Sequence, residues 1–542
     1  MIGAELIAET LRQLGVEHVF GIVGIPVVEI ADACIEKGIR FIPFRNEQQA
    51  SLAASIYGYL TNKPGVLLTV GGPGIVNALA GVYNANSNKW PLMVMAGSTK
   101  ICLQGKGGFQ ELDQVSLMKP WAKSSFRAVL SSQIPQFLER AYWTSIADVP
   151  GTTYIDLPDD LIKQECYEDI RVMKFDFSLL STITPELTRI KRTSELLKDA
   201  RFPLLIIGKG AANASETLRQ FVGTHQIAFL PTPMGKGIIP DASDRNVSSA
   251  RSLVLKHADV VLVAGARLNW ILHFGEPPKF NKDVKIVQID TDAGELARNV
   301  STLELGILGD VGRTMSSVSD QLNGHQFPAL PKIVVELIEK REQALRQQEE
   351  IVNDDLMPSH TQALAAIRKH IPADANIVAE GARTMDLSRQ SLYLCEPRQR
   401  LDAGTNGTMG IGLAYAVTAK LTEENKPLIV IQGDSAFGFS AMEIETLVRE
   451  RLPCLIIVLN NSGIYNGVEN PREYIPYTKK PLPSTALTFG VRYERISCSL
   501  GGTGYFVQKC KELDDVLKKG MEDMLSGKIV LINVLVKPHA KL

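Results

Sequence analysis

The sequence of 542 residues lacks several features that would each define a class of protein. Its seven cysteines contain no C-x-x-C pair and are odd in number, so we expect reduced thiols in an intracellular compartment and no disulfide framework. Lysine and arginine (58) nearly balance aspartate and glutamate (59), and no basic run is interleaved with aromatic residues. Nucleic acid is therefore a poor candidate partner.

Long hydrophobic runs are missing as well. The longest uncharged stretch, residues 65–88, is interrupted by a GGPG sequence, and other apolar runs are shorter than the roughly 20 residues that cross a bilayer. Near the N-terminus, Glu5, Glu9 and Arg12 recur at helical spacing, without the basic start and apolar core of a signal peptide. We expect a soluble protein that begins with a helix and has no membrane insertion.

The sequence does contain an alternation of short apolar runs and longer helical patterns from end to end. Apolar residues make up 45% of the chain and charged residues 22%, the ordinary balance of a globular protein. A chain of this length exceeds one hydrophobic core, so we expect roughly two to four domains. The alternation predicts an α/β fold with mainly parallel sheets covered by helices on both faces. The expected strands are 65–70, 92–96, 204–207, 260–264, 286–289, 428–431, 455–459 and 529–536.

Two stretches divide this alternation into three units. Strand signals disappear around residues 165–187, and residues 334–355 are too rich in charge for a core helix. We therefore predict three tandem α/β domains, at residues 1–165, 188–330 and 356–540.

The most informative stretch is PLIVIQGDSAFGFSAMEIETLVRERLPCLIIVLNNSGIYNG, which starts at Pro427. It reads as strand, turn, helix, strand and loop, with Asp434 at the end of the first strand and Asn461 at the end of the second. A right-handed crossover brings both strand ends to one edge of the sheet, where open α/β sheets bind ligands. A carboxylate and an amide oxygen suit Mg²⁺, which completes its coordination with phosphate oxygens.

Small residues flank the candidate metal ligand. Gly433 and Ser435 stand beside Asp434 at the start of a helix, where backbone N–H groups can approach an anion. A Gly-Asp-Ser turn by itself is common turn chemistry. Together with the spacing to Asn461 and the strand-helix-strand context, it predicts a site for a metal-bound diphosphate.

This combination resembles the signature of thiamine-diphosphate enzymes, a Gly-Asp turn followed after one βαβ step by paired asparagines. The segments FIPFRNEQQASLAASIYGYL, GGPGIVNALAGVYNA and RLDAGTNGTMGIGLAYA also match, so the resemblance covers the whole chain in the family's usual order of three domains. It implies that the first domain binds the pyrimidine ring of the cofactor. The third domain would bind the diphosphate and Mg²⁺ through Asp434, Asn461 and Gly463, with Tyr465 beside the cofactor.

The resemblance also implies roles for residues that would otherwise look ordinary. Glu47 alone would be a carboxylate at a helix start, and Met409 alone would be a core residue. In the family the glutamate hydrogen-bonds the pyrimidine ring and promotes formation of the reactive ylide. The Gly407 backbone receives the ring amine, and Met409 supports the bent cofactor. The cofactor then serves as nucleophile and electron sink.

Three further segments, at residues 105–114, 265–275 and 460–467, resemble the branch that contains 2-hydroxyacyl-CoA lyase and oxalyl-CoA decarboxylase, in particular a fungal peroxisomal member. Both kinds of enzyme release formyl-CoA from a coenzyme A thioester. Phe109 and Gln110 stand where lyases resemble Phe-Gln and decarboxylases resemble Tyr-Glu. A neutral amide can orient a 2-hydroxyl group without repelling an electron-rich intermediate, so the lyase is favoured. Gln110 could equally be an amide that only supports its neighbours.

Other interpretations stay open. An acetolactate-synthase-like enzyme is disfavoured because Gly-Ile-Tyr follows the paired asparagines, and because GKGAA (208–212) is only a fragment of a dinucleotide fingerprint and reads as a plain strand-helix turn. An inactive scaffold homologue is disfavoured because the cofactor-site residues are intact. Arg267 is a candidate contact of the central domain with coenzyme A, with a surface or interdomain ion pair as the alternative.

Two expectations concern assembly and location. In the resembled family Glu47 of one subunit meets the diphosphate domain of another, which implies a homodimer or homotetramer. The final residues, Ala540, Lys541 and Leu542, resemble the Ser-Lys-Leu address that the peroxisomal import receptor reads, and the alternative is a frayed basic terminus. We expect a peroxisomal lyase of fatty-acid catabolism with thiamine diphosphate and Mg²⁺ as cofactors.

Overall fold

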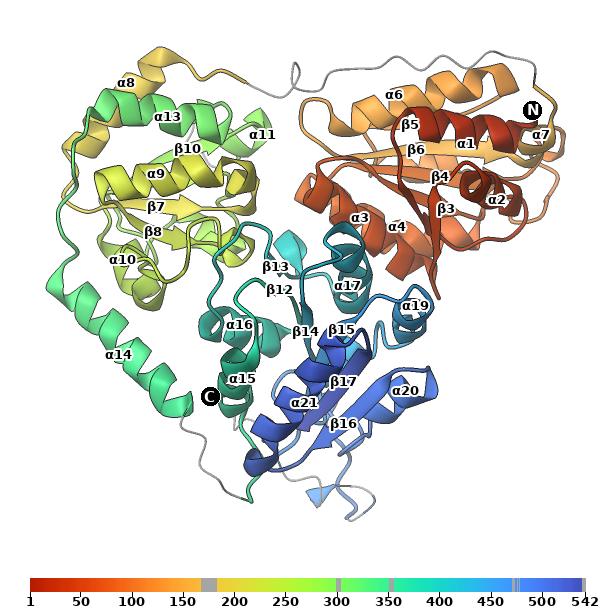
Figure 1. Ribbon diagram of the computed structural model, residues 1–542. Helices are drawn as coiled ribbons and strands as arrows, with labels where there is room; N and C mark the ends of the chain where they lie inside the picture. The colour runs from red at the N-terminus through yellow and green to blue at the C-terminus, as the bar shows by residue number, and fades with distance from the viewer. Residues whose placement is uncertain are drawn as a thin grey trace.

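Three parallel sheets, one in each third of the chain, form the framework of the computed structural model (Figure 1). The structure describes residues 1–166, 183–298, 304–349, 355–469, 473–474, 476 and 478–538. Within each sheet, neighbouring strands run parallel. The predicted α/β class with mainly parallel sheets is therefore confirmed.

The first sheet has the order β2-β1-β3-β4-β6-β5. Along its inner strands, alternate side chains enter two different cores: Leu67 packs on one face, and Val66 and Leu68 pack on the other. Helices α3 and α4 cover the first face, and helices α1, α2 and α6 cover the second. The strands are β1 (His18–Gly21), β2 (Arg40–Pro43), β3 (Gly65–Thr69), β4 (Leu92–Ser98), β5 (Ser124–Arg127) and β6 (Thr152–Pro158). The helices are α1 (Gly3–Gln13), α2 (Val28–Glu36), α3 (Glu47–Thr61), α4 (Pro73–Asn88), α5 (Gln114–Met118), α6 (Ile134–Ile146) and α7 (Asp159–Lys163).

The second sheet, β11-β10-β9-β7-β8, is also covered on both faces. Helices α8, α9 and α13 pack on one face and α10 on the other. The strands are β7 (Pro203–Ile207), β8 (Ala228–Pro231), β9 (Val260–Ala264), β10 (Lys285–Asp290) and β11 (Ile307–Leu308). The helices are α8 (Leu187–Lys198), α9 (Ser215–His225), α10 (Arg251–His257), α11 (Ala293–Leu296) and α13 (Val311–Leu322).

The third sheet, β13-β12-β14-β15-β17-β16, repeats the strand order of the first when its strands are counted along the chain. Helices α15 and α21 pack on one face, and α17 and α19 pack on the other. The strands are β12 (Asn376–Glu380), β13 (Arg400–Leu401), β14 (Leu428–Gly433), β15 (Cys454–Asn460), β16 (Thr503–Val507) and β17 (Ile529–Leu535). The helices are α15 (His360–His370), α16 (Ala382–Ser391), α17 (Ile411–Thr422), α18 (Asp434–Phe437), α19 (Glu443–Arg449), α20 (Glu494–Ser499) and α21 (Leu513–Leu525).

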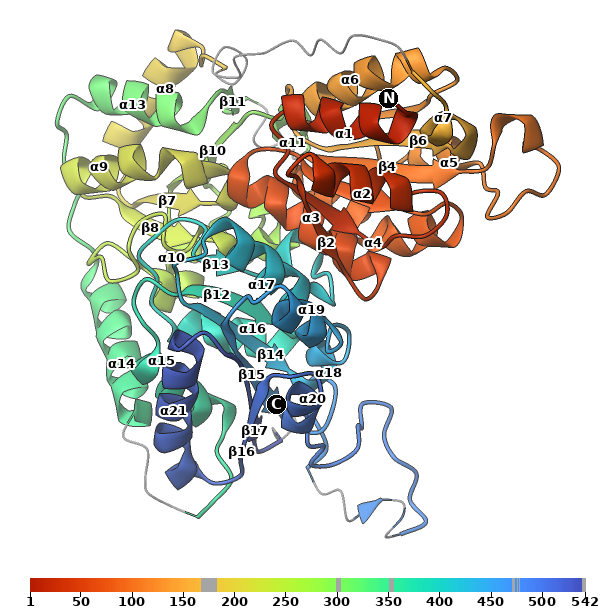
Figure 2. The same cartoon turned by 45° about the vertical axis from the view of Figure 1, so that its right-hand side comes forward.

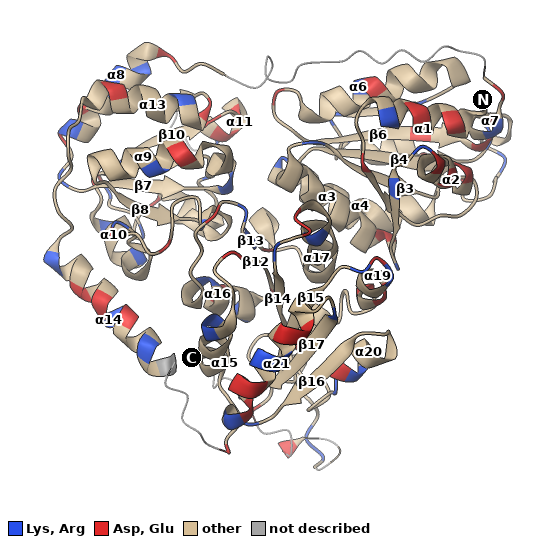
Figure 3. Cartoon of the chain, in the orientation of Figure 1, with Lys and Arg blue, Asp and Glu red and all other residues tan. Residues whose placement is uncertain are grey.

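All eight strands expected from the sequence are present as β3, β4, β7, β9, β10, β14, β15 and β17. The charge-dense stretch 334–355 contains most of a further helix, α14 (Lys332–Glu349). This helix runs along the outside of the molecule from the second domain to the third, and acidic and basic side chains are interspersed along it (Figure 3). No helix among the described residues has both the length and the apolar content needed to cross a bilayer.

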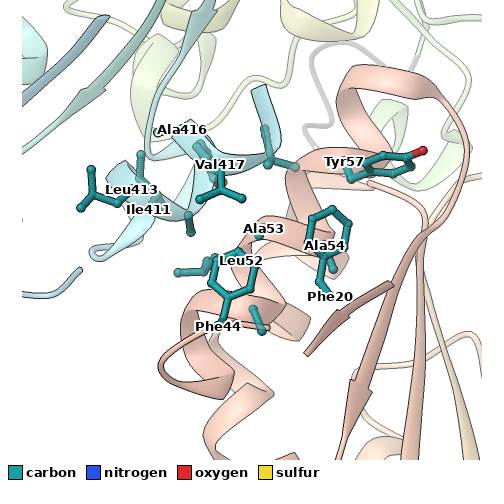
Figure 4. Packing of buried hydrophobic residues seen from close by; sticks show 14 of the residues in the cluster. Phe20, Phe44, Leu52, Ala53, Ala54, Tyr57, Ile411, Leu413, Ala416 and Val417 are labelled. Carbon is teal, nitrogen blue, oxygen red and sulfur yellow. The ribbon is translucent and has the colours of Figure 1, made fainter. Parts of the chain in front are cut away.

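The first and third domains share one core through the contact of α3 with α17 (Figure 2). Leu52 and Ala53 of α3 lie close to Leu413 and Val417 of α17 in this cluster (Figure 4). The Thr418 hydroxyl also donates a hydrogen bond to the Ala53 carbonyl (3.0 Å). Small side chains let the two helices approach closely, and this fixes the N-terminal ends of both helices relative to each other.

Candidate active site

The predicted Gly-Asp turn lies where the third sheet ends. Gly433 is the last residue of β14, and Asp434 is the first residue of α18. Asp434 is buried, and its carboxylate accepts hydrogen bonds from the backbone N–H groups of Ser435 and Gly463 (3.0 Å each). The strand order reverses between β12 and β14, so the turn occupies the edge where open α/β sheets bind ligands.

The loop after β15 completes this half of the site. Asn461 follows the strand directly and is buried, and its amide nitrogen donates to the Tyr465 carbonyl (3.0 Å). Tyr465 has a left-handed backbone (φ 62°), and its side chain is exposed. The hydrogen bond from Gly463 to Asp434 closes this loop onto the Gly-Asp turn. The structure therefore brings together the predicted residues Gly433, Asp434, Ser435, Asn461, Gly463 and Tyr465.

The donor set fits a hard cation. Burial raises the pKa of Asp434 to about 6, although backbone N–H donors oppose the rise. Among the described residues its hydrogen bonds come from backbone groups, so no basic side chain offsets its charge there. No cluster of three or more His, Cys, Asp or Glu side chains occurs in the described part of the chain. Mg²⁺ needs no such cluster, because it binds one or two carboxylates together with substrate phosphates and water.

The predicted pyrimidine loop stands at the start of α17. Gly407 has a left-handed backbone (φ 64°) and is exposed, whereas Met409 is half-buried two residues before the helix. Thr408 between them donates a hydrogen bond to Asn84 of α4 (3.3 Å). The loop is thus tied to the first domain, and its exposed backbone is available to a ligand.

Glu47 is the first residue of α3, as predicted, and its carboxylate accepts a hydrogen bond from Asn77 (3.1 Å). The first turn of α3, which contains Glu47, approaches the start of α17: a Cβ atom on Gly410 would lie 3.2 Å from the Gln49 amide nitrogen. None of the hydrogen bonds among the described residues joins Glu47 to Asp434.

Phe109 and Gln110 lie together on a loop of the first domain. They line a cavity of about 200 Å³. The other lining residues are Ile25, Pro26, Gly71, Ser98, Thr99, Lys100, Leu103 and Asp159. Phe109 is 73% exposed, and Gln110 has a left-handed backbone (φ 54°), which is uncommon for a residue with a side chain. Such conformations are retained where the surrounding structure enforces them, and they cluster at functional sites.

Arg267 lies elsewhere, at the junction of the first and second domains. Its guanidinium pairs with Glu295 (3.4 Å) and donates to the Ser87 carbonyl. It lines a cavity of about 1160 Å³ to which all three domains contribute. Lys209, from the GKGAA connection between β7 and α9, lines the same cavity. Its ammonium group bonds to Asn88, and burial lowers its pKa to about 7.

Two buried residues beside the site were not predicted. Glu380 ends β12 and accepts hydrogen bonds from the start of α17, and Gln114 holds the turn before α4 by accepting from the Gly72 N–H (2.7 Å). The sequence feature that could have identified Glu380 is its position as a polar residue at the end of a short apolar run. Gln114 has no comparable local signal.

Comparison with known proteins identifies the family. Residues 1–117 match the profile described as thiamine pyrophosphate enzyme, N-terminal TPP binding domain. Residues 190–318 match its central domain, and residues 381–534 match its C-terminal TPP binding domain. The chain belongs to the thiamine pyrophosphate enzyme family, as the sequence resemblance predicted.

Individual relatives show which branch of the family this chain resembles. The chain is 43% identical to a 2-hydroxyacyl-CoA lyase of Saccharomyces cerevisiae, over 98% of this chain and 96% of the relative. It is 40% identical to 2-hydroxyacyl-CoA lyase 1 of Homo sapiens, over 99% and 95%. It is 36% identical to an oxalyl-CoA decarboxylase of Escherichia coli, over 99% and 95%. The branch suggested by the sequence is confirmed.

Proposed function

We propose that this protein is a thiamine-diphosphate- and Mg²⁺-dependent lyase that cleaves a 2-hydroxyacyl-CoA into formyl-CoA and an aldehyde. In this reaction the bond between the thioester carbon and the hydroxyl-bearing carbon breaks. The hydroxyl group loses its proton and becomes the aldehyde, and the thioester carbon gains a proton. Thiamine diphosphate, when bound, supplies the carbon nucleophile and accepts the electron pair of the broken bond.

The chain's own residues would bind and orient the reactants. Asp434 and Asn461, with the Gly463 carbonyl, would hold Mg²⁺ and through it the diphosphate. Glu47 would hold a proton at the pyrimidine ring nitrogen. Gln110 would orient the substrate hydroxyl as a neutral hydrogen-bonding group, and Phe109 would line the same cavity.

The observation that carries the choice of a lyase is Gln110, which shares a cavity with Phe109 at the end of the first sheet. A glutamate at this position would place a negative charge beside a carbon that gains electron density, whereas an amide does not. Full-length similarity to proteins named 2-hydroxyacyl-CoA lyase supports the same choice. The alternative, oxalyl-CoA decarboxylase, is supported by the similarity to the bacterial decarboxylase.

The large interdomain cavity supports binding of the coenzyme A part of the substrate. Its lining includes five basic residues that can meet phosphate groups: Lys63, Lys89, Lys209, Arg267 and Arg398. Arg267 donates a hydrogen bond to the Ser87 carbonyl of the first domain and already pairs with Glu295, which is an ion pair within the second domain. A phosphate would have to share or replace that partner.

The test is a parallel assay of the purified protein, loaded with thiamine diphosphate and Mg²⁺, on a 2-hydroxyacyl-CoA and on oxalyl-CoA. Mass spectrometry would follow formyl-CoA and the aldehyde separately, because only the lyase forms both. We expect both products from the hydroxyacyl substrate and none after removal of Mg²⁺ with a chelator. Formyl-CoA from oxalyl-CoA alone would establish the decarboxylase instead.

Assembly and location belong to the same proposal. Since no hydrogen bond among the described residues joins Glu47 to Asp434, we propose a homodimer or homotetramer in which one subunit's Glu47 reaches the diphosphate domain of another. Light scattering combined with the activity assay tests this, and a fully active monomer would contradict it. The proposed peroxisomal address, residues 540–542, lies outside the described residues.

A further inference from the structure

The carboxylate of Glu380 is a densely hydrogen-bonded acidic group near the candidate site. Glu380 is fully buried at the end of β12. One of its oxygens accepts the backbone N–H groups of Gly410 and Ile411, the latter at 3.1 Å. The other oxygen accepts the N–H of Gly412 (2.8 Å) and the side-chain amide of Gln432 (2.6 Å). Four donors therefore converge on one carboxylate.

These donors come from both cofactor-binding segments. Gly410, Ile411 and Gly412 follow Met409 directly, so Glu380 holds the end of the pyrimidine loop. Gln432 immediately precedes the Gly433–Asp434 turn on the neighbouring strand, where it pairs in register with Glu380. A single side chain thus joins the loop that would hold the ring to the turn that would hold the diphosphate.

The N-terminus of α17 is an electrostatically favourable place for the negative charge of Glu380. The first N–H groups of α17 carry the positive end of the helix dipole, and a carboxylate there satisfies donors that have no partner within the helix. Burial nevertheless raises the pKa of Glu380 to about 7, with the backbone and Gln432 donors opposing the rise. The four donors therefore favour the charged form against the effect of burial.

Neighbouring atoms pack closely around the Glu380 carboxylate. A Cβ atom on Gly412 would lie 2.1 Å from the Gln432 amide nitrogen and 2.7 Å from a Glu380 oxygen. The next residue, Gly381, has a left-handed backbone (φ 99°) and lies against the Gly433 N–H, which a Cβ atom there would approach to 3.3 Å. Displacement of Glu380 would therefore move the loop and the turn relative to each other.

We infer that Glu380 is a positioning residue that sets the separation between the pyrimidine loop and the diphosphate turn, and so favours one bent conformation of the cofactor. This inference rests on the proposed function, because it requires thiamine diphosphate at both segments. Glu380 acts through the backbone of residues 410–412 and through Gln432, not by touching the ligand.

The experiment compares binding of the whole cofactor with binding of its diphosphate part alone. In Glu380→Gln, an amide N–H₂ replaces the oxygen that accepts Gly412 and Gln432, so at least one buried donor loses its acceptor. Calorimetry would measure binding of Mg²⁺-thiamine diphosphate and of Mg²⁺-pyrophosphate, which meets only the diphosphate turn. We expect binding of the intact cofactor to weaken at least about tenfold and binding of pyrophosphate to change less than about threefold.

The matched control is Glu494→Gln. Glu494 is also a buried carboxylate of the third domain, and it accepts hydrogen bonds from Asn533 (2.9 Å) and Arg492 (2.6 Å), which belong to neither the pyrimidine loop nor the Gly-Asp turn. This variant should bind both ligands as the parent does. Thermal unfolding of each protein without ligand separates a general loss of stability from an effect on the site.

The outcomes distinguish the two proposals. Unchanged affinity for thiamine diphosphate in Glu380→Gln, or equal weakening with both ligands, would overturn the positioning role. A parent protein that binds pyrophosphate but not thiamine diphosphate would overturn the proposed function instead. If Glu380→Gln does not fold, Glu380→Asp keeps the charge with a shorter reach, and the same selective loss of cofactor affinity is expected. Its absence would refute the inference.

Discussion

The carboxylate of Glu443 in the third domain accepts a hydrogen bond from the backbone N–H of Arg45 in the first (3.1 Å). Arg45 stands two residues before Glu47, so this bond anchors the start of α3 to α19. The Thr446 hydroxyl also donates to Glu443 (2.6 Å). Glu443 is 1% exposed, and burial raises its pKa to about 7.

This contact predicts a pH-dependent effect of Glu443→Gln. A pKa raised from 4.5 to about 7 means that the stability contributed by Glu443 is fully present below pH 4.5 and is lost as pH rises through 7. Glutamine does not titrate. The free energy of unfolding of the variant, relative to the parent, should therefore increase between pH 5 and pH 8, by up to roughly 3 kcal/mol. Chemical denaturation at each pH measures it. A pH-independent difference between Glu443→Gln and the parent would contradict the prediction.

Glu47→Gln should leave the fold and cofactor binding largely intact. Turnover should fall at least about a hundredfold, because the ring nitrogen loses its proton partner. Steady-state kinetics at saturating cofactor, together with a binding titration, separates the two effects. Glu36→Gln, an exposed position on α2, is the control. Near-normal turnover of Glu47→Gln would remove Glu47 from the reaction.

Asp434→Ala should abolish tight binding of the metal and the cofactor. We expect at least about a hundredfold weaker Mg²⁺ affinity, because loss of a direct ligand costs more than loss of its supporting partners. Cofactor content after dialysis is the measurement, with Asp386→Ala on the exposed side of α16 as the control. Retention of the cofactor by Asp434→Ala would show that another residue holds the metal.

Gln110→Glu tests the choice between lyase and decarboxylase. Aldehyde-forming activity should fall at least about tenfold, since a like charge near the reacting carbon costs on the order of 1–4 kcal/mol. Any decarboxylation of oxalyl-CoA should be less affected. Gln104→Glu, an exposed position near the same loop, should change neither activity. Equal losses with both substrates would argue that Gln110 does not decide specificity.

Location can be tested independently of activity. A fluorescent protein fused to the N-terminus should appear in puncta that coincide with a peroxisomal marker. Deletion of Leu542 should disperse the signal to the cytosol without changing turnover. Diffuse fluorescence from the intact C-terminus would refute the peroxisomal assignment.

Much of the fold and of the candidate metal site could be predicted because their arrangement follows from local rules. Apolar runs of strand length identify β14 and β15, and the handedness of the crossover then brings Asp434 and Asn461 to one edge. The helix within residues 334–355 was harder to predict, because a high density of charged residues indicates exposure but does not exclude a helix. Ion pairs along the surface of α14, such as Lys332 with Glu336 (3.7 Å), are compatible with a helix that contributes little to a core.

The roles of Glu380 and Gln114 could not be predicted in this way. Glu380 bonds to N–H groups 30 to 32 positions further along the chain, and no spacing rule connects a strand end to a helix start in the next unit. Gln114 likewise reaches Gly72 only because the sheet places two loops side by side. Such residues become visible only when the fold supplies their partners.

The first and third sheets share one strand order, and α3 and α17 are corresponding helices in the two units, each following the second strand. A contact between the same element of two like units is what an approximate twofold axis produces. The chain therefore contains, between its first and third domains, the kind of symmetric contact that two copies of one protein make. A bulky substitution at Ala53 and one at Ala416 should thus disturb a single shared interface from its two opposite sides.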